Sequence, residues 1–188
     1  MSGKTPARDE ALALLKEFNQ NESLLKHAYA VEGVMRFMAR KLGEDEEKWG
    51  IIGLVHDLDY ERFPKMHCHK TQEILAARGW PEDYIHAVIS HGWGLCNDVM
   101  PESRMEQMLY AIDELTGFIT AVALVRPSRS LSDLEVKSVT KKWKDKAFAA
   151  GVNRSVIEKG ATMMGMALPD LISDTIAGMR EVAARIGL

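Results

Sequence analysis

Apolar residues along most of this chain recur every three or four positions, which is the period of an amphipathic α-helix. The clearest case is the stretch 22–42, where Asn21 can cap the start and Gly43 can end the helix. The apolar residues of this stretch with helical spacing are Leu24, Val31, Val34, Met35 and Met38. No segment shows the convincing alternation that is typical of a strand. The pattern therefore predicts an all-α fold, a helical bundle of irregular packing.

Cap residues and helix breakers divide the rest of the chain into further helices. We expect helices over residues 9–18, 22–42, 45–57, 67–78, 81–91, 103–125, 153–166 and 169–186. Pro81 fits the first turn of the helix that it opens. Residues 58–66 and 92–101 are expected to be loops, and the mixed, basic stretch 128–152 receives no helix. A chain of 188 residues without repeats or a long linker predicts a single domain over residues 1–188.

Composition and charge narrow the class of protein. The chain is 46% hydrophobic, enough for a core, and its net charge of −3 argues against general nucleic-acid binding. Its two cysteines, Cys68 and Cys96, cannot form a disulfide scaffold, which favours a reducing compartment. The start lacks an apolar signal segment, and no run reaches the roughly 18 apolar residues of a membrane span. We therefore expect a cytoplasmic protein.

The most informative residues are His56 and Asp57, which close the apolar run 49–55. Burying a lone carboxylate is costly, and a bound metal ion would offset that cost because carboxylate and neutral imidazole are both good ligands. His27 falls on the inward face of the helix 22–42, and Asp113 lies in the apolar stretch 109–115. Taken singly, His27 also fits a hydrogen-bonded core histidine, and the pair 56–57 also fits a capped helix end.

In this order and spacing, the four residues resemble the HD superfamily of metal-dependent phosphohydrolases. The segment from His67 to Leu75 is similar to the superfamily's HPxxGxxIL helix start, with Cys68 in the proline position. The segment 87–91 looks like its following I..H element, and Asp113 through Arg126-Pro127 resembles its D…RP helix. The resemblance covers about residues 24–130. His-Asp-Leu-Asp replaces His-Asp-Ile-Gly, and no GYP element follows His91, which makes cyclic-di-GMP a poor substrate candidate.

The resemblance implies a metal centre with six ligands. His27, His56, Asp57 and Asp113 would hold one ion, with Asp57 as a possible bridge to a second ion. Among the remaining histidines, helix geometry allows at most one of His67 and His69, and at most one of His86 and His91, to face the site. The resemblance selects His67 and His91 for the second ion. Mixed nitrogen and oxygen ligands suit one or two divalent transition metal ions: Mn, Fe, Co, Ni or Zn.

Basic residues are the candidates for binding a phosphate. Lys70 lies one helical turn after His67 and therefore shares its helix face, and Arg126 follows the helix of Asp113. We expect Lys70 and Arg126 to contact substrate, with Lys70 and Asp57 assigned to catalysis. The run from Lys137 to Lys146 fits a basic flap or, more simply, a solvated helix face. Asp59 and Glu61 fit either supporting acids near the metal or ordinary loop charges.

Together, these observations predict a metal-dependent phosphohydrolase that cleaves a small phosphoester, such as a nucleotide, by metal-activated water. The HD-type metal-binding core would span residues 22–130, and residues 131–188 would form a C-terminal helical extension packed on it. Two alternatives stay open. One is an HD-fold di-iron oxygenase with the same ligands, and the other is a non-catalytic metal-binding regulatory module.

Overall fold

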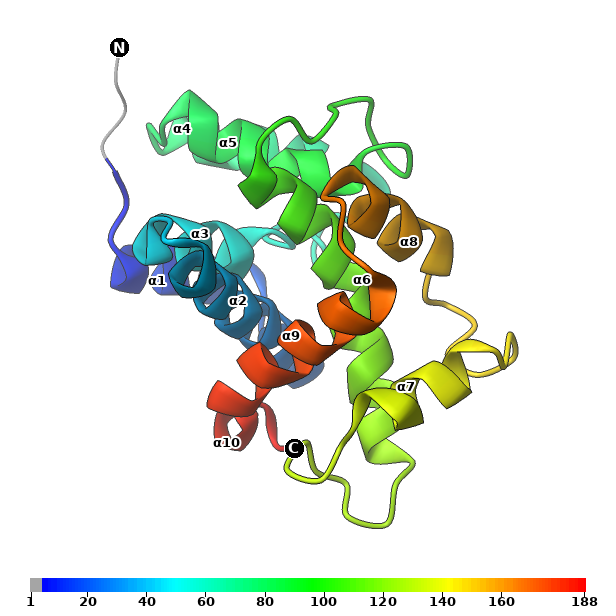
Figure 1. Cartoon of the computed structure of the whole chain (residues 1–188). Helices are drawn as coiled ribbons and strands as arrows, with labels where there is room; N and C mark the ends of the chain where they lie inside the picture. The colour runs from blue at the N-terminus through cyan, green and yellow to red at the C-terminus, as the bar shows by residue number, and fades with distance from the viewer. Residues whose placement is uncertain (1–4) are drawn as a thin grey trace.

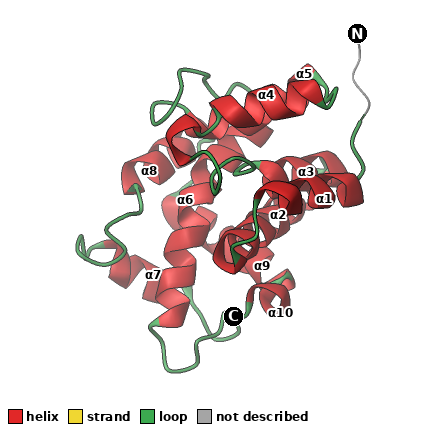
Figure 2. Cartoon of the chain, turned by 180° about the vertical axis from the view of Figure 1, so that it is seen from behind, coloured by secondary structure: helices red, strands yellow, loops and turns green. Residues whose placement is uncertain are grey.

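The structure, a computed structural model, describes residues 5–188. These residues form ten α-helices and two short 3₁₀-helices, η1 and η2, and their only strand-like pairing is an isolated bridge between Trp93 and Asn97. The view in Figure 2 shows helices and loops throughout. The α-helices are α1 (Arg8–Phe18), α2 (Glu22–Leu42), α3 (Glu46–Val55), α4 (His69–Ala77), α5 (Glu82–Ile89), α6 (Arg104–Leu124), α7 (Val136–Trp143), α8 (Arg154–Met163), α9 (Leu168–Glu181) and α10 (Ala183–Ile186). The predicted all-α fold is confirmed.

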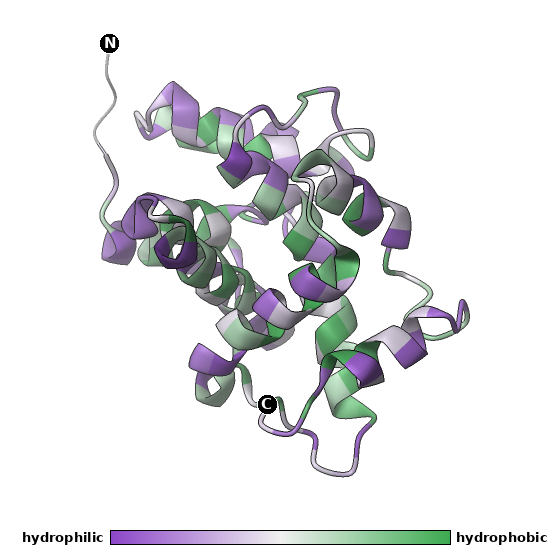
Figure 3. Cartoon of the chain, viewed as in Figure 1, coloured by the Kyte–Doolittle hydropathy of each residue, from purple (hydrophilic) through white to green (hydrophobic). Residues whose placement is uncertain are grey.

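The long helices α2 and α6 organise the bundle. Helix α2 packs against α3, α9 and α6. Helix α8 packs against α6 on the side away from α2 (Figure 1). Helix α6 is largely hydrophobic in Figure 3, and most of its residues are buried. Helix α3 is buried at every position from Trp49 to Val55, so it ends deep inside the bundle. The residues that follow its last turn are therefore delivered to the interior.

Two glycines let the C-terminal helices approach the rest of the bundle closely. A Cβ atom at Gly178 of α9 would lie 2.7 Å from the Cα of Val34 in α2. A Cβ atom at Gly160 of α8 would lie 2.5 Å from the Cβ of Ala111 in α6. Side chains at these positions would clash with a neighbouring helix, so glycine is required by the packing distance. Helix α9 therefore lies directly against α2, and helix α8 lies directly against α6.

A buried acid joins the two ends of the described chain. Glu32 of α2 is 3% exposed, and its carboxylate accepts hydrogen bonds from Arg8 of α1 at 2.5 and 2.9 Å. Arg36 lies 3.0 Å from the same carboxylate, and Arg185 of α10 lies 3.6 Å from it. We call these four residues the Glu32 cluster. It ties the first and last helices to the middle of α2.

Several element boundaries differ from the sequence-based prediction. The helix expected over 67–78 begins at His69, because the chain first makes η1 (Pro64–Met66) and then a turn at Cys68 with φ of 66°. The stretch 128–152 contains α7, which buries Val139 and was not predicted. The fifth helix ends at Ile89 and continues as η2 (Ser90–Gly92), and the last predicted helix is interrupted at Val182.

No helix within residues 5–188 combines the length and the apolar character that crossing a bilayer requires.

Candidate metal centre

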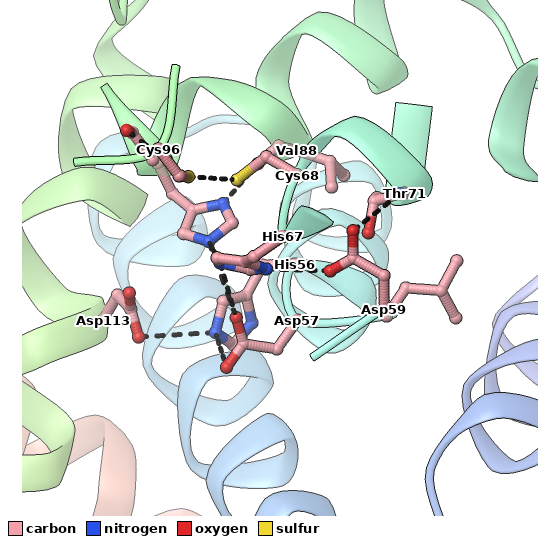
Figure 4. A network of polar contacts seen from close by, with 12 residues as sticks. His56, Asp57, Asp59, His67, Cys68, Thr71, Val88, Cys96 and Asp113 are labelled. Carbon is pink, nitrogen blue, oxygen red and sulfur yellow. Dashed lines mark hydrogen bonds and ion pairs between the residues drawn. The ribbon is translucent and has the colours of Figure 1, made fainter. Parts of the chain in front are cut away.

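Three α-helices, two turns and the 3₁₀-helix η2 bring six of the predicted site residues together. His56 caps the end of α3, Asp57 begins the turn after it, and His27 and Asp113 project from α2 and α6. His67 lies in the turn between η1 and α4, and His91 lies in η2. All of them except the fully buried His56 line one cavity of about 400 Å³. Figure 4 shows His56, Asp57, His67 and Asp113 converging on a common centre.

One group of donor atoms comes from His27, His56, Asp57 and Asp113. The Nε2 atom of His27 lies 3.2 Å from Nε2 of His56 and 2.9 Å from Oδ1 of Asp113. The Oδ2 atom of Asp57 lies 3.7 Å from His27 Nε2 and 3.4 Å from His56 Nε2, and His56 Nε2 lies 3.3 Å from Asp113 Oδ1. Ligands held about 2.1 Å from one ion lie roughly 3–3.5 Å from each other. These spacings therefore fit one ion at the centre of the group.

A second group uses the other oxygen of Asp57. Its Oδ1 atom lies 3.4 Å from Nε2 of His67 and 3.5 Å from Nε2 of His91. The two imidazole nitrogens lie 3.1 Å apart. The two oxygens of Asp57 thus face two different histidine pairs, as a carboxylate that bridges two ions would.

The hydrogen bonds of the imidazole rings test whether these groups suit a cation. His56 Nδ1 and His91 Nδ1 lie 2.8 and 2.5 Å from the backbone carbonyls of Gly53 and Val88. A carbonyl only accepts, so each Nδ1 must carry the proton and donate, and in a neutral ring the Nε2 then presents a lone pair. The lone pair of His56 faces the Nε2 atom of His27 at 3.2 Å, and that of His91 faces the Nε2 atom of His67 at 3.1 Å, where two unprotonated nitrogens would repel each other. A proton or a metal ion between them removes the repulsion, so the donor set fits a metal.

Asp59 orients His67 in the same way. This residue is fully buried, and its Oδ1 accepts a hydrogen bond from His67 Nδ1 at 2.8 Å. Its Oδ2 accepts the backbone N–H of Thr71 at the start of α4, also at 2.8 Å. A carboxylate behind a histidine fixes the ring and makes its other nitrogen a better ligand. The position of Asp59 therefore fits a supporting acid, one of the two roles that the sequence left open.

The carboxylates of the centre remain ionised in the metal-free protein. Burial favours the neutral acid, yet the neighbouring His56, together with hydrogen bonds from the histidines, holds the pKa of Asp57 and of Asp113 well below the usual range. Burial likewise disfavours a charged His56, but the carboxylates of Asp57 and Asp113 outweigh it and raise the His56 pKa well above 6.5. The pKa of His67 is raised by Asp59 and Asp57 against the effect of burial. In the metal-free protein these shifts favour protonated His56 and His67 rings beside ionised carboxylates.

The two other histidines of the predicted pairs lie elsewhere. His69 is exposed, and its Nε2 is 3.1 Å from the carbonyl of Cys96. His86 Nδ1 lies 2.9 Å from Glu106 Oε1, next to the N-terminal cap of α6. Among the described residues, the structure thus brings His67 and His91 into the cavity and leaves His69 and His86 outside it.

The basic residues chosen as substrate contacts do not line the cavity. Lys70 is about one-third exposed and pairs with Glu73 at 2.5 Å. The shared helix face with His67 is wrong, because α4 begins after His67 and the turn at Cys68 breaks the helical register. Arg126 pairs with Asp133 at 2.7 Å beyond the end of α6. Lysines of α7 and the residues after it, within 137–146, are mostly exposed, which agrees with a solvated helix face.

The two cysteines form a feature that the sequence reasoning did not find. Cys68 and Cys96 are hydrogen-bonded to each other, with their sulfur atoms 3.0 Å apart, and Cys96 lines the cavity. The hydrogen bond with Cys68, together with the nearby histidines, lowers the pKa of the Cys96 thiol to about 6 against the effect of burial. No spacing signal in the sequence could pair residues 68 and 96.

Comparison with known proteins identifies the class. Residues 24–116 match the family model described as HD domain, and this part of the chain therefore belongs to the HD-domain family. Members of this family are generally metal-dependent phosphohydrolases. The suspected resemblance is confirmed.

The chain is also similar to Ribonuclease Y of Oleidesulfovibrio alaskensis. The two are 31% identical over 104 residues, which cover 53% of this chain and 19% of that protein. The chain thus spans about a fifth of the length of this curated relative. No solved structure matches the chain significantly.

We predict that Asp59→Asn weakens metal binding at the His67–His91 pair by about 10–100-fold. An amide has one acceptor oxygen, so it cannot accept from both His67 and the Thr71 N–H. The affinity for Mn²⁺ should be measured by calorimetric titration, with Asp98→Asn in an exposed loop as the control. Equal affinities in the two variants would remove Asp59 from this role.

Proposed function

We propose that this chain is a metal-dependent phosphohydrolase that acts on a small phosphoester. The observation that carries the proposal is the position of Asp57 between two histidine pairs, with one oxygen facing each. We infer that His27, His56, Asp57 and Asp113 hold one divalent ion. His67, His91 and the second oxygen of Asp57 would hold another. Mn, Fe, Co, Ni and Zn all suit this set of nitrogen and oxygen ligands.

The chain's own residues have defined tasks in this proposal. Two bound divalent ions would polarise a phosphoryl oxygen and supply hydroxide near neutral pH. The backbone carbonyls of Gly53 and Val88 fix the rings of His56 and His91, so that their Nε2 atoms point to the centre without reorganisation. Asp59 does the same for His67. The histidines and Asp57 serve as ligands and not as nucleophiles, because their donor atoms are committed to the ions.

The cavity wall favours a substrate with a single phosphate. Among the residues of the described chain that line it, none is a lysine or an arginine. The charge of a phosphate would therefore be met by the ions and imidazoles, and a polyphosphate would leave most of its charge unpaired. Tyr60 and Leu95, which are 45% and 54% exposed, offer apolar surface at the same cavity for the organic part of the ester. A nucleoside monophosphate has this combination of groups.

The comparisons support the reaction class at a coarse level. The HD family is generally hydrolytic, and the name Ribonuclease Y denotes a protein that cleaves RNA, which is a phosphodiester. Neither Lys70 nor Arg126 lines the cavity, so the geometry does not support their predicted contacts with substrate, and these stay predictions.

The decisive experiment is metal analysis of protein purified without chelator, followed by a panel of phosphoesters. We expect release of phosphate from monophosphates in preference to triphosphates, loss of activity with EDTA and recovery with Mn²⁺. Turnover that requires iron and oxygen and releases no phosphate would establish the oxygenase alternative. Tight metal binding without turnover of any compound would establish the regulatory module.

We predict that metal affinity rises with pH and continues to rise above pH 6.5. The raised pKa values of His56 and His67 keep these rings protonated above that pH in the metal-free protein, and a protonated imidazole cannot bind an ion. A raised histidine pKa also stabilises the metal-free fold at low pH, and that stability is lost as pH rises through the raised value.

The melting temperature of the protein with and without Mn²⁺ measures both effects across pH 5–9. The metal-free protein should become less stable as pH rises through the raised histidine pKa values. The difference between metal-loaded and metal-free protein should increase over the same range. A difference that is independent of pH would contradict proton displacement at the histidines.

A further inference from the structure

The two thiols beside the metal centre form a pair with unequal access. Cys68 is 1% exposed, while Cys96 is partly exposed and belongs to the cavity wall. Their sulfur atoms are 3.0 Å apart, as the dashed line in Figure 4 marks. A disulfide needs about 2.05 Å between sulfurs, so the two atoms must approach by roughly 1 Å. A small molecule in the cavity reaches Cys96 first and finds Cys68 directly behind it.

The backbone holds this pair in place. Cys68 has φ of 66° and ψ of −43°, a backbone conformation that residues with a side chain rarely adopt. Strain of this kind persists only where the surroundings impose it. The backbone of Gly92 also lies against both sulfurs, because a Cβ there would come within 2.3 Å of Cys96 Sγ and 2.5 Å of Cys68 Sγ. The packing of the pair therefore depends on a glycine directly after His91.

We propose that Cys68 and Cys96 are a peroxide-oxidisable dithiol that closes reversibly into a disulfide at the wall of the metal centre. The co-reactant is a hydroperoxide small enough to enter the cavity. A lysine-free, partly apolar wall admits an uncharged peroxide without an electrostatic penalty. Cys96 is the residue that meets the oxidant, and Cys68 is the resolving residue.

The reaction balances in two steps. The sulfur of Cys96 attacks the terminal oxygen of the peroxide, the O–O bond breaks, and the leaving oxygen departs as water or alcohol with the thiol proton. Cys96 is then a sulfenic acid. The sulfur of Cys68 attacks the sulfur of Cys96, the S–O bond breaks, and hydroxide leaves as water with the proton of Cys68. Two thiols lose two electrons, and the peroxide gains them.

The disulfide would also act on the second histidine pair, a consequence that rests on the proposed function. Cys68 follows His67 directly, and its donor atom lies within 4.8 Å of those of His67 and His91. The closing movement displaces the backbone beside His67, and a ligand shifted by about 1 Å no longer fits the ion. Oxidation should therefore release the ion at His67 and His91 and leave the ion at His27 in place.

The chemical test uses the reduced full-length chain and substoichiometric hydrogen peroxide. Because the chain has just two cysteines, an intramolecular disulfide can join only these residues. We expect the intact mass to fall by two hydrogens, with both thiols lost to alkylation and both recovered with dithiothreitol. Covalent dimers on a non-reducing gel, or two thiols that remain free while methionines oxidise, would overturn the proposal.

Two matched variants assign the roles. Cys68→Ser should accumulate a sulfenic acid at Cys96 that dimedone traps, since the resolving thiol is missing. Cys96→Ser should leave Cys68 unreacted at the same peroxide dose, because Cys68 is buried. Dimedone labelling of Cys68 in that variant, or equal labelling in both variants, would overturn the assignment.

Mn²⁺ stoichiometry of the oxidised and reduced protein tests the consequence for the metal centre. Loss of one of two ions on oxidation, reversed by dithiothreitol, is the expected result. Two ions retained by the disulfide form would overturn the coupling. A chain that never binds a second ion refutes the proposed dinuclear centre instead, and the mass and thiol measurements still decide the oxidation itself.

Discussion

The variant Asp57→Asn loses both metal ions and at least about 10³-fold in kcat/KM on the best phosphoester, if the proposed centre is right. Asparagine keeps the shape of the side chain but removes the negative charge, and it turns an NH₂ group toward one of the two histidine pairs. The ions supply several kcal/mol of charge stabilisation in the transition state, which corresponds to a loss of about this size. Metal content by mass spectrometry and initial rates measure the two effects separately.

Asp98→Asn is the matched control, because it makes the same chemical change at an exposed loop position. It should keep the metal content and the rate of the wild type. Circular dichroism should be used to test whether Asp57→Asn is folded. A folded Asp57→Asn protein that retains two ions would disprove the bridging role of Asp57, whatever its activity.

Glu32→Gln should lower the free energy of unfolding by about 3 kcal/mol, because it removes the buried carboxylate that Arg8, Arg36 and Arg185 share. For a chain of this size the melting temperature should fall by roughly 6–12 °C. Glu32 is 3% exposed, so water cannot replace the lost contacts to Arg8 and Arg36 without rearrangement. Thermal and denaturant unfolding of the metal-free protein measure the change.

Glu47→Gln offers a close comparison, since Glu47 binds the same Arg36 at 2.8 Å but is mostly exposed. Exposed ion pairs contribute little, so this variant should lose less than about 1 kcal/mol. If both substitutions destabilise the protein equally, burial of Glu32 is not the source of its effect. A smaller effect of Glu32→Gln than of Glu47→Gln would reverse the argument.

Sequence periodicity was sufficient for the helices that bury a continuous apolar face. Helix α2 has the predicted bounds 22–42, and α6 lies within one residue of its predicted ends, because their caps and apolar stripes agree. Helix α7 was missed because its apolar stripe is short: Val136, Val139 and Trp143 have helical spacing, but only Val139 is fully buried among the basic residues. The positive-φ turn at Cys68 has no sequence signal either. The residues around it fit an uninterrupted helical pattern, and no glycine or asparagine marks the turn.

The site was predictable where charge stood out against an apolar background. His56 and Asp57 stand at the end of a buried helix, where burying a carboxylate costs free energy unless a partner such as a cation offsets it. The structure places both residues at the candidate metal centre. Asp59 and Glu32 were harder, because their importance comes from partners that folding supplies. Asp59 meets His67 eight positions away, and Glu32 meets Arg8 across 24 positions. Sequence spacing alone does not predict such contacts between residues that are far apart along the chain.

The two histidine groups of the centre differ in the length of chain that separates their members. Asp57, His67 and His91 lie within one stretch of 35 positions, whereas His27 and Asp113 are 86 positions apart. In the proposed centre, an ion held by the second pair closes a short loop, while an ion held by the first is a removable cross-link across half the chain. Such a link restricts the unfolded ensemble as a disulfide does, but it is lost when the ion dissociates at low free-metal concentration. The folded lifetime of this protein would then follow the supply of its metal.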